Sequence, residues 1–96
     1  MRYLAFDASD DADGVVTLEA MASTSAADHA AVMQEVREVL DWATAQFPHT
    51  QGPVDDGMDW HHDLQVSVED GGWHTVTLTI GASPRFAEAF HIAFPS

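Results

Sequence analysis

The richest cluster of metal-ligating and basic side chains lies between residues 55 and 63, where four aspartates and two histidines fall within nine positions. In an extended strand, side chains two residues apart project to the same side. Asp59 and His61, or His61 and Asp63, could therefore hold one divalent metal ion between them, as carboxylate and imidazole groups do in zinc sites. Asp59 and Asp63 are about 13 Å apart along such a strand, so all three cannot bind one ion. A further ligand would have to come from Asp55 or Asp56 folding back.

Signatures of other catalytic chemistry are missing. The chain has no cysteine, which excludes disulfides, thiolate metal sites and cysteine nucleophiles. No serine stands in a G-x-S-x-G turn, and the paired Gly71 and Gly72 fall between two predicted strands rather than in a phosphate-binding loop. The acidic loop at residues 9–14 has Ser9 and Ala20 where the first and twelfth ligands of an EF-hand would stand. We therefore expect a non-enzymatic protein.

Two tryptophans define a different kind of candidate site. Trp42 lies about 120° from the centre of an apolar helical stripe, on the same side as Glu35 and Glu38. The predicted strand register places Trp73 on the outer face of a sheet. Exposed tryptophans are frequent anchors in protein interfaces. Glu35, Glu38, Trp42 and Trp73 are thus the predicted partner-binding residues.

The charge balance limits the partners of this chain. Three arginines and no lysine stand against sixteen acidic residues, which gives a formal charge of −13 and an isoelectric point near 4.3. A field of this sign repels phosphate backbones and anionic lipid headgroups, and it attracts basic proteins. We expect a basic protein partner, no nucleic acid and no membrane, although acidity also serves solubility. No apolar run has the length of a membrane span or a secretion signal, so the expected location is the cytoplasm.

A long amphipathic helix is expected from Ser25 to Phe47. Its apolar positions recur every three or four residues and share one face: His29, Val32, Met33, Val36, Val39, Leu40, Ala43 and Phe47. Ser25 and Asp28 form a capping box with a short acidic arm. Pro48 ends the helix because its ring nitrogen carries no hydrogen.

Two hairpins flank this helix. Alternating apolar residues predict strands over Tyr3–Ala8 and Val15–Ala22, joined by the turn-forming residues 9–14. A second pair of strands, near residues 59–68 and 73–80, must place Leu64 opposite Leu78 so that their apolar sides share a face. A three-residue loop then remains, of the size that a type I turn with a glycine bulge requires.

The C-terminal segment from Ser83 to Phe94 has a capping serine followed by a proline, which favours a helix. A strand is the alternative, but it would bury Glu88. The helix gives the order β-β-α-β-β-α over one domain, residues 1–96. We predict an α+β two-layer sandwich, with a four-stranded, mainly antiparallel sheet and two helices on one face. The strand order and the oligomeric state stay open.

Two functional hypotheses follow. The first is a small acidic, non-enzymatic protein-binding or regulatory domain that engages a basic partner through acidic surface and Trp42 or Trp73. The alternative is a divalent-metal-binding protein or metal-dependent hydrolase that uses Asp59, His61 and Asp63. Elemental analysis of the purified protein distinguishes the two, because only the second requires stoichiometric metal.

The net charge generates a prediction that does not depend on the fold. Sodium chloride should raise the melting temperature from low to moderate concentration, because mobile ions screen the repulsion among sixteen carboxylates. Thermal unfolding followed by circular dichroism at several salt concentrations measures this. A melting temperature that falls over the same range would contradict it.

Overall fold

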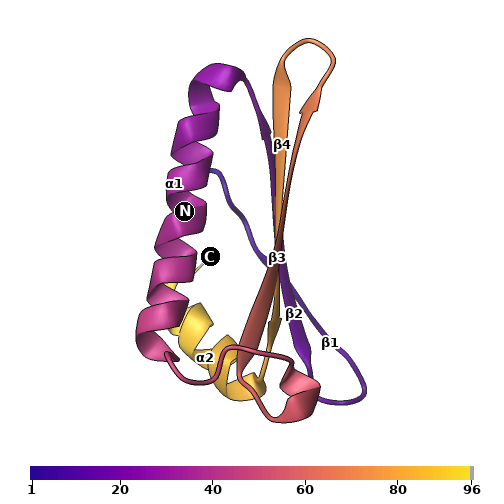
Figure 1. Cartoon of the computed structure of the whole chain (residues 1–96), viewed down its shortest axis with the longest axis vertical. Helices are drawn as coiled ribbons and strands as arrows, with labels where there is room; N and C mark the ends of the chain where they lie inside the picture. The colour runs from indigo at the N-terminus through magenta and orange to yellow at the C-terminus, as the bar shows by residue number, and fades with distance from the viewer. Residues whose placement is uncertain (96) are drawn as a thin grey trace.

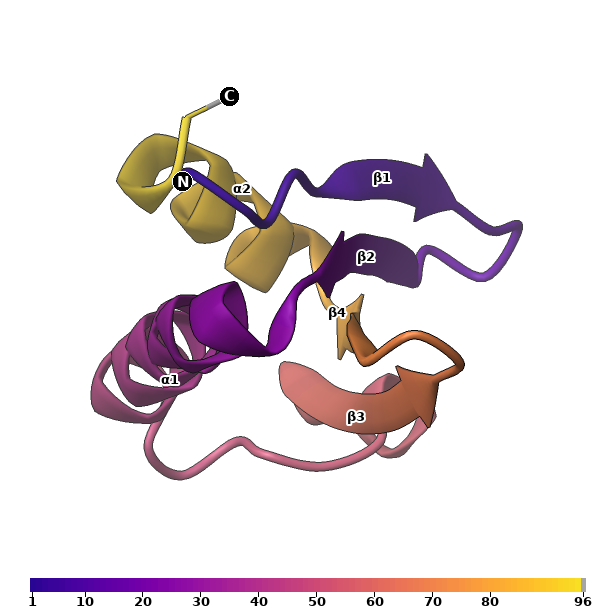
Figure 2. The same ribbon diagram turned by 90° about the horizontal axis from the view of Figure 1, so that it is seen from above.

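Two helices pack on one face of a four-stranded antiparallel sheet (Figure 1). The computed structural model describes residues 1–95. Along the chain the elements are β1 (Asp7–Asp10), β2 (Val16–Thr24), α1 (Ala26–Gln46), the 3-10 helix η1 (Val54–Asp56), β3 (Trp60–Glu69), β4 (Trp73–Ala82) and α2 (Pro84–Ala93). The strand order is β1-β2-β4-β3, so β2 and β4 are central and β1 and β3 are the edges (Figure 2). The predicted two-layer α+β class is confirmed.

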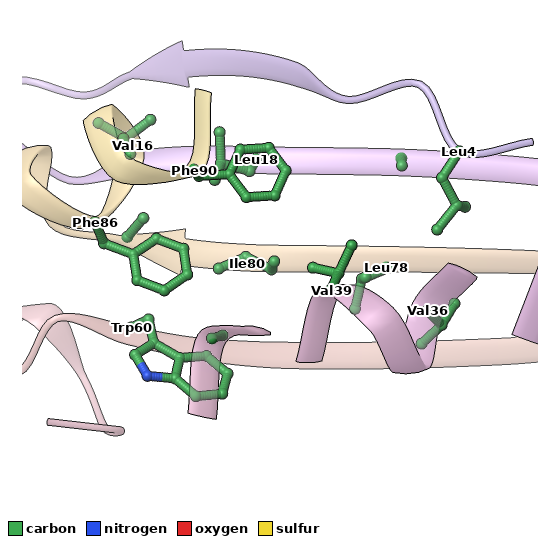
Figure 3. Close-up of a cluster of buried hydrophobic side chains, with 14 of the residues drawn as sticks. Leu4, Val16, Leu18, Val36, Val39, Trp60, Leu78, Ile80, Phe86 and Phe90 are labelled. Carbon is green, nitrogen blue, oxygen red and sulfur yellow. The ribbon is translucent and has the colours of Figure 1, made fainter. Parts of the chain in front are cut away.

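The core lies between the two central strands and the helices (Figure 3). Alternate apolar side chains of β2 and β4 point to the helices and are buried: Val16, Leu18, Ala20, Ala22, Val76, Leu78, Ile80 and Ala82. From the helix side, α1 contributes Val32, Val36, Val39 and Ala43, and α2 contributes Phe86 and Phe90. Burial of each large apolar side chain stabilises the fold by about 1.5–3 kcal/mol relative to its exposure.

The helix ends follow the sequence signals with one exception. Ser83 caps α2 as predicted, since its Oγ accepts a hydrogen bond from the N–H of Phe86 at 3.1 Å, and Pro84 occupies the first helical position. The helical prediction for this segment is therefore confirmed. Ser25 is the N-cap of α1, but its side chain makes no capping hydrogen bond, so the predicted capping box is wrong. Asp28 still places its charge in the first turn, at the positive end of the helix dipole.

The first strand is shorter and later than predicted. The expected strand over Tyr3–Ala8 is wrong, because pairing with β2 begins only at Asp7 and ends at Asp10. The carboxylate of Glu35 on α1 accepts hydrogen bonds from the N–H groups of Tyr3 and Leu4, both at 3.0 Å. These amides are therefore bonded to a helix side chain, and the N-terminal segment crosses to α1 before it enters the sheet.

The second hairpin has the predicted register, with Leu64 opposite Leu78. Its turn differs from the prediction. The N–H of Gly72 donates to the carbonyl of Glu69 at 3.1 Å, and Gly71 has a φ of 85°. A positive φ at the third position after a negative φ at Asp70 fits a type II turn, not the expected type I turn. The left-handed glycine expected at the end of the loop is present, since Gly72 has a φ of 81°.

The core model predicts which truncations destabilise the protein. Leu78→Ala should lower the free energy of unfolding by about 3 kcal/mol, because it leaves a cavity at a fully buried site. Ile92→Ala is the control, since Ile92 is 76% exposed, and it should change stability by less than about 0.5 kcal/mol. Urea unfolding of both variants measures the difference. Equal losses would contradict this assignment of the core.

Candidate functional site on the uncovered sheet face

The first predicted metal ligand, Asp59, is a buried structural residue at the start of β3. Its Oδ1 accepts a hydrogen bond from Ser83 Oγ at 2.7 Å, and its carboxylate forms an ion pair with the guanidinium of Arg85. The backbones of the same two residues are also hydrogen-bonded, since the N–H of Ser83 donates to the Asp59 carbonyl at 2.8 Å. Asp59 therefore fastens the start of β3 to the N-terminus of α2.

These contacts also set the charge of the carboxyl group. Hydrogen bonding from Arg85, reinforced by Ser83, outweighs the opposing effect of burial and lowers the pKa of Asp59 from 3.8 to about 2. Asp59 is thus a carboxylate at neutral pH with its partners already supplied. A carboxylate with so low a pKa is a weak base, and its oxygens are already bonded to Ser83 and Arg85 rather than free to bind a metal ion.

The other predicted ligands lie apart from these contacts. His61 projects from the outer face of β3, with its ring across the backbone of Gly81 on β4. A Cβ atom on Gly81 would lie 2.3 Å from His61 Nε2, so only glycine leaves room for the ring in this position. Asp63 accepts a hydrogen bond from Gln65 at 3.2 Å, and Asp55 and Asp56 are exposed in η1. Across residues 1–95, no three histidine or carboxylate side chains are grouped so as to hold a metal ion.

Trp42 packs in the interface between α1 and α2. It is half-buried, and its ring centroid lies 5.4–6.3 Å from those of four phenylalanines: Phe47, Phe86, Phe90 and Phe94. The prediction that Trp42 lies outside the core is wrong, because α2 packs beside α1 and covers this flank. Glu35 is likewise engaged with the N-terminal segment, so Glu38 is the one predicted residue of α1 whose side chain stays exposed.

Trp73 lies where the register predicted it, on the outer face of the sheet opposite Glu69. Its side chain is 50% exposed. Met21, on the same face of β2, is 61% exposed and was not singled out from the sequence. Its position within an alternating strand predicted an outward direction, but not that the face would stay uncovered.

We call the outer surface of the three longest strands the open sheet face. Both helices lie on the opposite side, so no helix covers it (Figures 1 and 2). It consists of Thr17, Glu19, Met21 and Ser23 from β2, His61, Asp63, Gln65, Ser67 and Glu69 from β3, and Trp73, Thr75, Thr77, Thr79 and Gly81 from β4. Thr75 Oγ1 donates to Glu69 Oε1 at 3.1 Å, and Thr79 Oγ1 lies 3.4 Å from Glu19 Oε2. The threonine hydroxyls thus support the carboxylates on both sides of β4.

The structure also brings together two histidines that no pattern in the sequence connects. His29 in the first turns of α1 lies against His74 of β4, with ring centroids 4.6 Å apart. Nδ1 of His74 lies 3.1 Å from the carbonyl of Gly72, and Nδ1 of His29 is buried without a hydrogen bond. The alternation of the strand places His74 on the helix side of the sheet, but it carries no information on which helix residue will lie against it.

Comparison with protein-family models, with curated proteins and with solved structures finds no match to this chain. Neither helix within residues 1–95 combines the length and apolarity needed to cross a membrane. The open sheet face and the residues that it displays are therefore the basis for a functional proposal.

The Asp59 contacts predict acid sensitivity. Because the folded pKa lies below the unfolded one, the pair stabilises the fold above about pH 4, and this stability is lost as the pH falls towards 2. The full shift corresponds to about 2.5 kcal/mol, but Arg85 is 70% exposed, so solvent screening reduces the expected value to roughly 1 kcal/mol.

Chemical unfolding between pH 2 and pH 6 tests this expectation. Asp59→Asn should be less stable than the parent protein at pH 6, and the two should converge near pH 2. Asp63→Asn removes the same charge from an exposed strand position, so it should retain the acid sensitivity of the parent. A constant difference between Asp59→Asn and the parent across this range would contradict the linkage.

Proposed function

We propose that this chain is a small acidic, non-enzymatic binding domain that engages a basic protein through the open sheet face. The observation that carries the proposal is a half-exposed Trp73 on an uncovered face, directly opposite the carboxylate of Glu69. An exposed tryptophan gives a partner a large apolar contact, and neighbouring carboxylates give it a charge to pair with.

The charge on this face is of one sign. Glu19 and Asp63 flank Thr79 across three strands, and Glu69 lies beside Trp73. None of the four strands contains a lysine or an arginine. The arginines are engaged or distant: Arg2 lies over the ring of Tyr3, Arg85 pairs with Asp59, and Arg37 is on α1. A cationic side chain of a partner would therefore meet carboxylates with no competing cation.

The apolar groups on the face suit an arginine-containing partner in particular. A guanidinium group can stack on the Trp73 ring while it donates hydrogen bonds to the Glu69 carboxylate. Met21 is unbranched and adapts its shape to a contacting surface. We expect the tryptophan to control the dissociation rate and the surrounding carboxylates to control the association rate.

The metal-dependent alternative receives less support from the contacts. Asp59 is the ligand closest to the interior, and both of its oxygens are bonded to Arg85 or Ser83. His61 and Asp63 remain as an exposed pair on a strand, which is too few protein ligands for a zinc site.

Isothermal titration with an arginine-rich peptide tests the proposal. Trp73→Ala should weaken binding about tenfold, which corresponds to about 1.4 kcal/mol, and Glu69→Gln should weaken it by a smaller factor. Added salt should weaken binding in every case.

Two variants are matched controls for this titration. Ile92→Ala removes an exposed apolar side chain from α2, and Glu38→Gln removes an exposed charge from α1, so both should bind as the parent does. Equal losses for Glu38→Gln and Glu69→Gln would show unspecific attraction by net charge. That result, or no binding at low salt, would count against the open sheet face as the site.

A further inference from the structure

The edge strand β3 has few of the features that normally prevent pairing with another strand, since its two acidic residues, Asp63 and Glu69, both project from the outer face. It runs for ten residues at the rim of the sheet, and its pairing with β4 is continuous from Trp60 to Glu69 without a bulge. It contains no lysine, proline or glycine. The opposite edge, β1, has four residues with an aspartate at each end. Short, charged edges resist strand addition, whereas long and regular ones invite it.

The free backbone groups of β3 can be assigned from the residue at its start. The carbonyl of Trp60 accepts a hydrogen bond from Gly52 at 2.7 Å, in a single parallel bridge with the preceding loop. The backbone of Trp60 therefore points away from β4. Since this direction alternates along an antiparallel strand, the N–H and C=O groups of the next even-numbered residues also point to the rim: His62, Leu64, Val66 and Val68.

The same residues carry apolar side chains that the helices leave uncovered. Val66 and Val68 face the helix layer, yet they are 46% and 66% exposed. The helices pack mainly against β2 and β4, and the exposure of the two valines shows that the part of β3 that carries them is left uncovered. The residues whose backbone N–H and C=O groups are free therefore include the two exposed valines, and both features lie on the same edge of the sheet.

We propose that β3 pairs with β3 of a second copy of this chain, antiparallel about a twofold axis, and joins the two sheets into one. Residues whose backbone points to the rim must meet residues of the same kind, so an even-numbered residue must face an even-numbered one. This parity also places the helices of both copies on the same side of the joined sheet. Symmetric registers of this kind are centred on a single residue, and the central candidates are Leu64, Gln65 and Val66.

Charge and occupancy select among the three registers. A centre at Val66 would place Asp63 opposite Glu69 twice, with like charges in contact. A centre at Leu64 would bring Trp60 into the pairing, although the loop already occupies its backbone. A centre at Gln65 uses only unpaired residues, places Leu64 opposite Val66 on the apolar side and places His61 opposite Glu69 on the outer side.

The proposal is independent of the partner-binding function, and its salt dependence has the opposite sign. Two copies that each carry a charge of −13 repel one another, so salt should strengthen their association while it weakens binding of a basic partner. Sedimentation equilibrium at rising protein concentration and moderate salt should reveal a dimer. A chain that stays monomeric at millimolar concentration would overturn the proposal.

Amide hydrogen exchange by NMR tests the pairing residue by residue. The N–H groups of Leu64 and Val66 should become protected as protein concentration rises, while those of Gln65 and Ser67 are protected at every concentration by β4. Concentration-dependent protection elsewhere, with Leu64 and Val66 still in rapid exchange, would show that a different surface associates.

Charge exchange tests the register. His61→Glu and Glu69→Lys should each weaken the dimer severalfold, and the double variant should restore it by placing Glu opposite Lys. Within one copy these positions are about 26 Å apart along β3, so rescue cannot arise inside a monomer. Glu38→Lys changes the net charge as Glu69→Lys does but lies on α1, and it should not weaken the dimer. A double variant that associates less than either single variant would overturn the Gln65-centred register.

Discussion

The structure depends on the pairing of β2 with β4 and on the burial of one side of that pair. An α-helix is about 10 Å wide and neighbouring strands are about 4.8 Å apart, so one helix covers about two strands. Both helices pack over β2 and β4, and the inward apolar side chains of these strands are buried, whereas the inward Thr24 and His74 are only half-buried. The outer face stays open because both helices lie on the other side of the sheet (Figure 1), and Val66 and Val68 of β3 stay exposed because the helices pack mainly against the two central strands. The two candidate interaction surfaces thus follow from a helix layer that covers one side of the sheet and is centred on β2 and β4.

Features set by local periodicity could be predicted from the sequence. The register of Leu64 with Leu78 followed from alternation and loop length, and the cap at Ser83 followed from local chemistry. Features set by distant neighbours could not. Trp42 is packed because a second helix arrives beside it, and Asp59 is occupied because Arg85 lies 26 positions later. The pattern of apolar residues in one sequence shows which side of a helix or strand faces the core. It does not show which other helix or strand will pack beside it.

This distinction explains why the candidate site moved. The sequence indicated acidity, exposed tryptophan and a non-enzymatic domain, but it divided the tryptophans between a helix and a sheet. Only Trp73 is available, because α2 packs against Trp42 whereas both helices leave the outer side of β4 open (Figure 1). The function proposed from the structure therefore keeps the chemistry inferred from composition and assigns it to a different surface. The roles proposed for the face and for the edge of the sheet depend on charge in opposite ways, which makes the two proposals separable.

The contact of His61 with Gly81 determines what a substitution at position 81 would do. The imidazole lies where a Cβ atom at position 81 would be, so a larger residue there requires the exposed His61 ring to turn away from β4. The ring can do this by rotating about its own side-chain bonds, without movement of the backbone. Replacement of Gly81 would therefore redirect an imidazole on the outer face of the sheet while leaving the strand pairing in place.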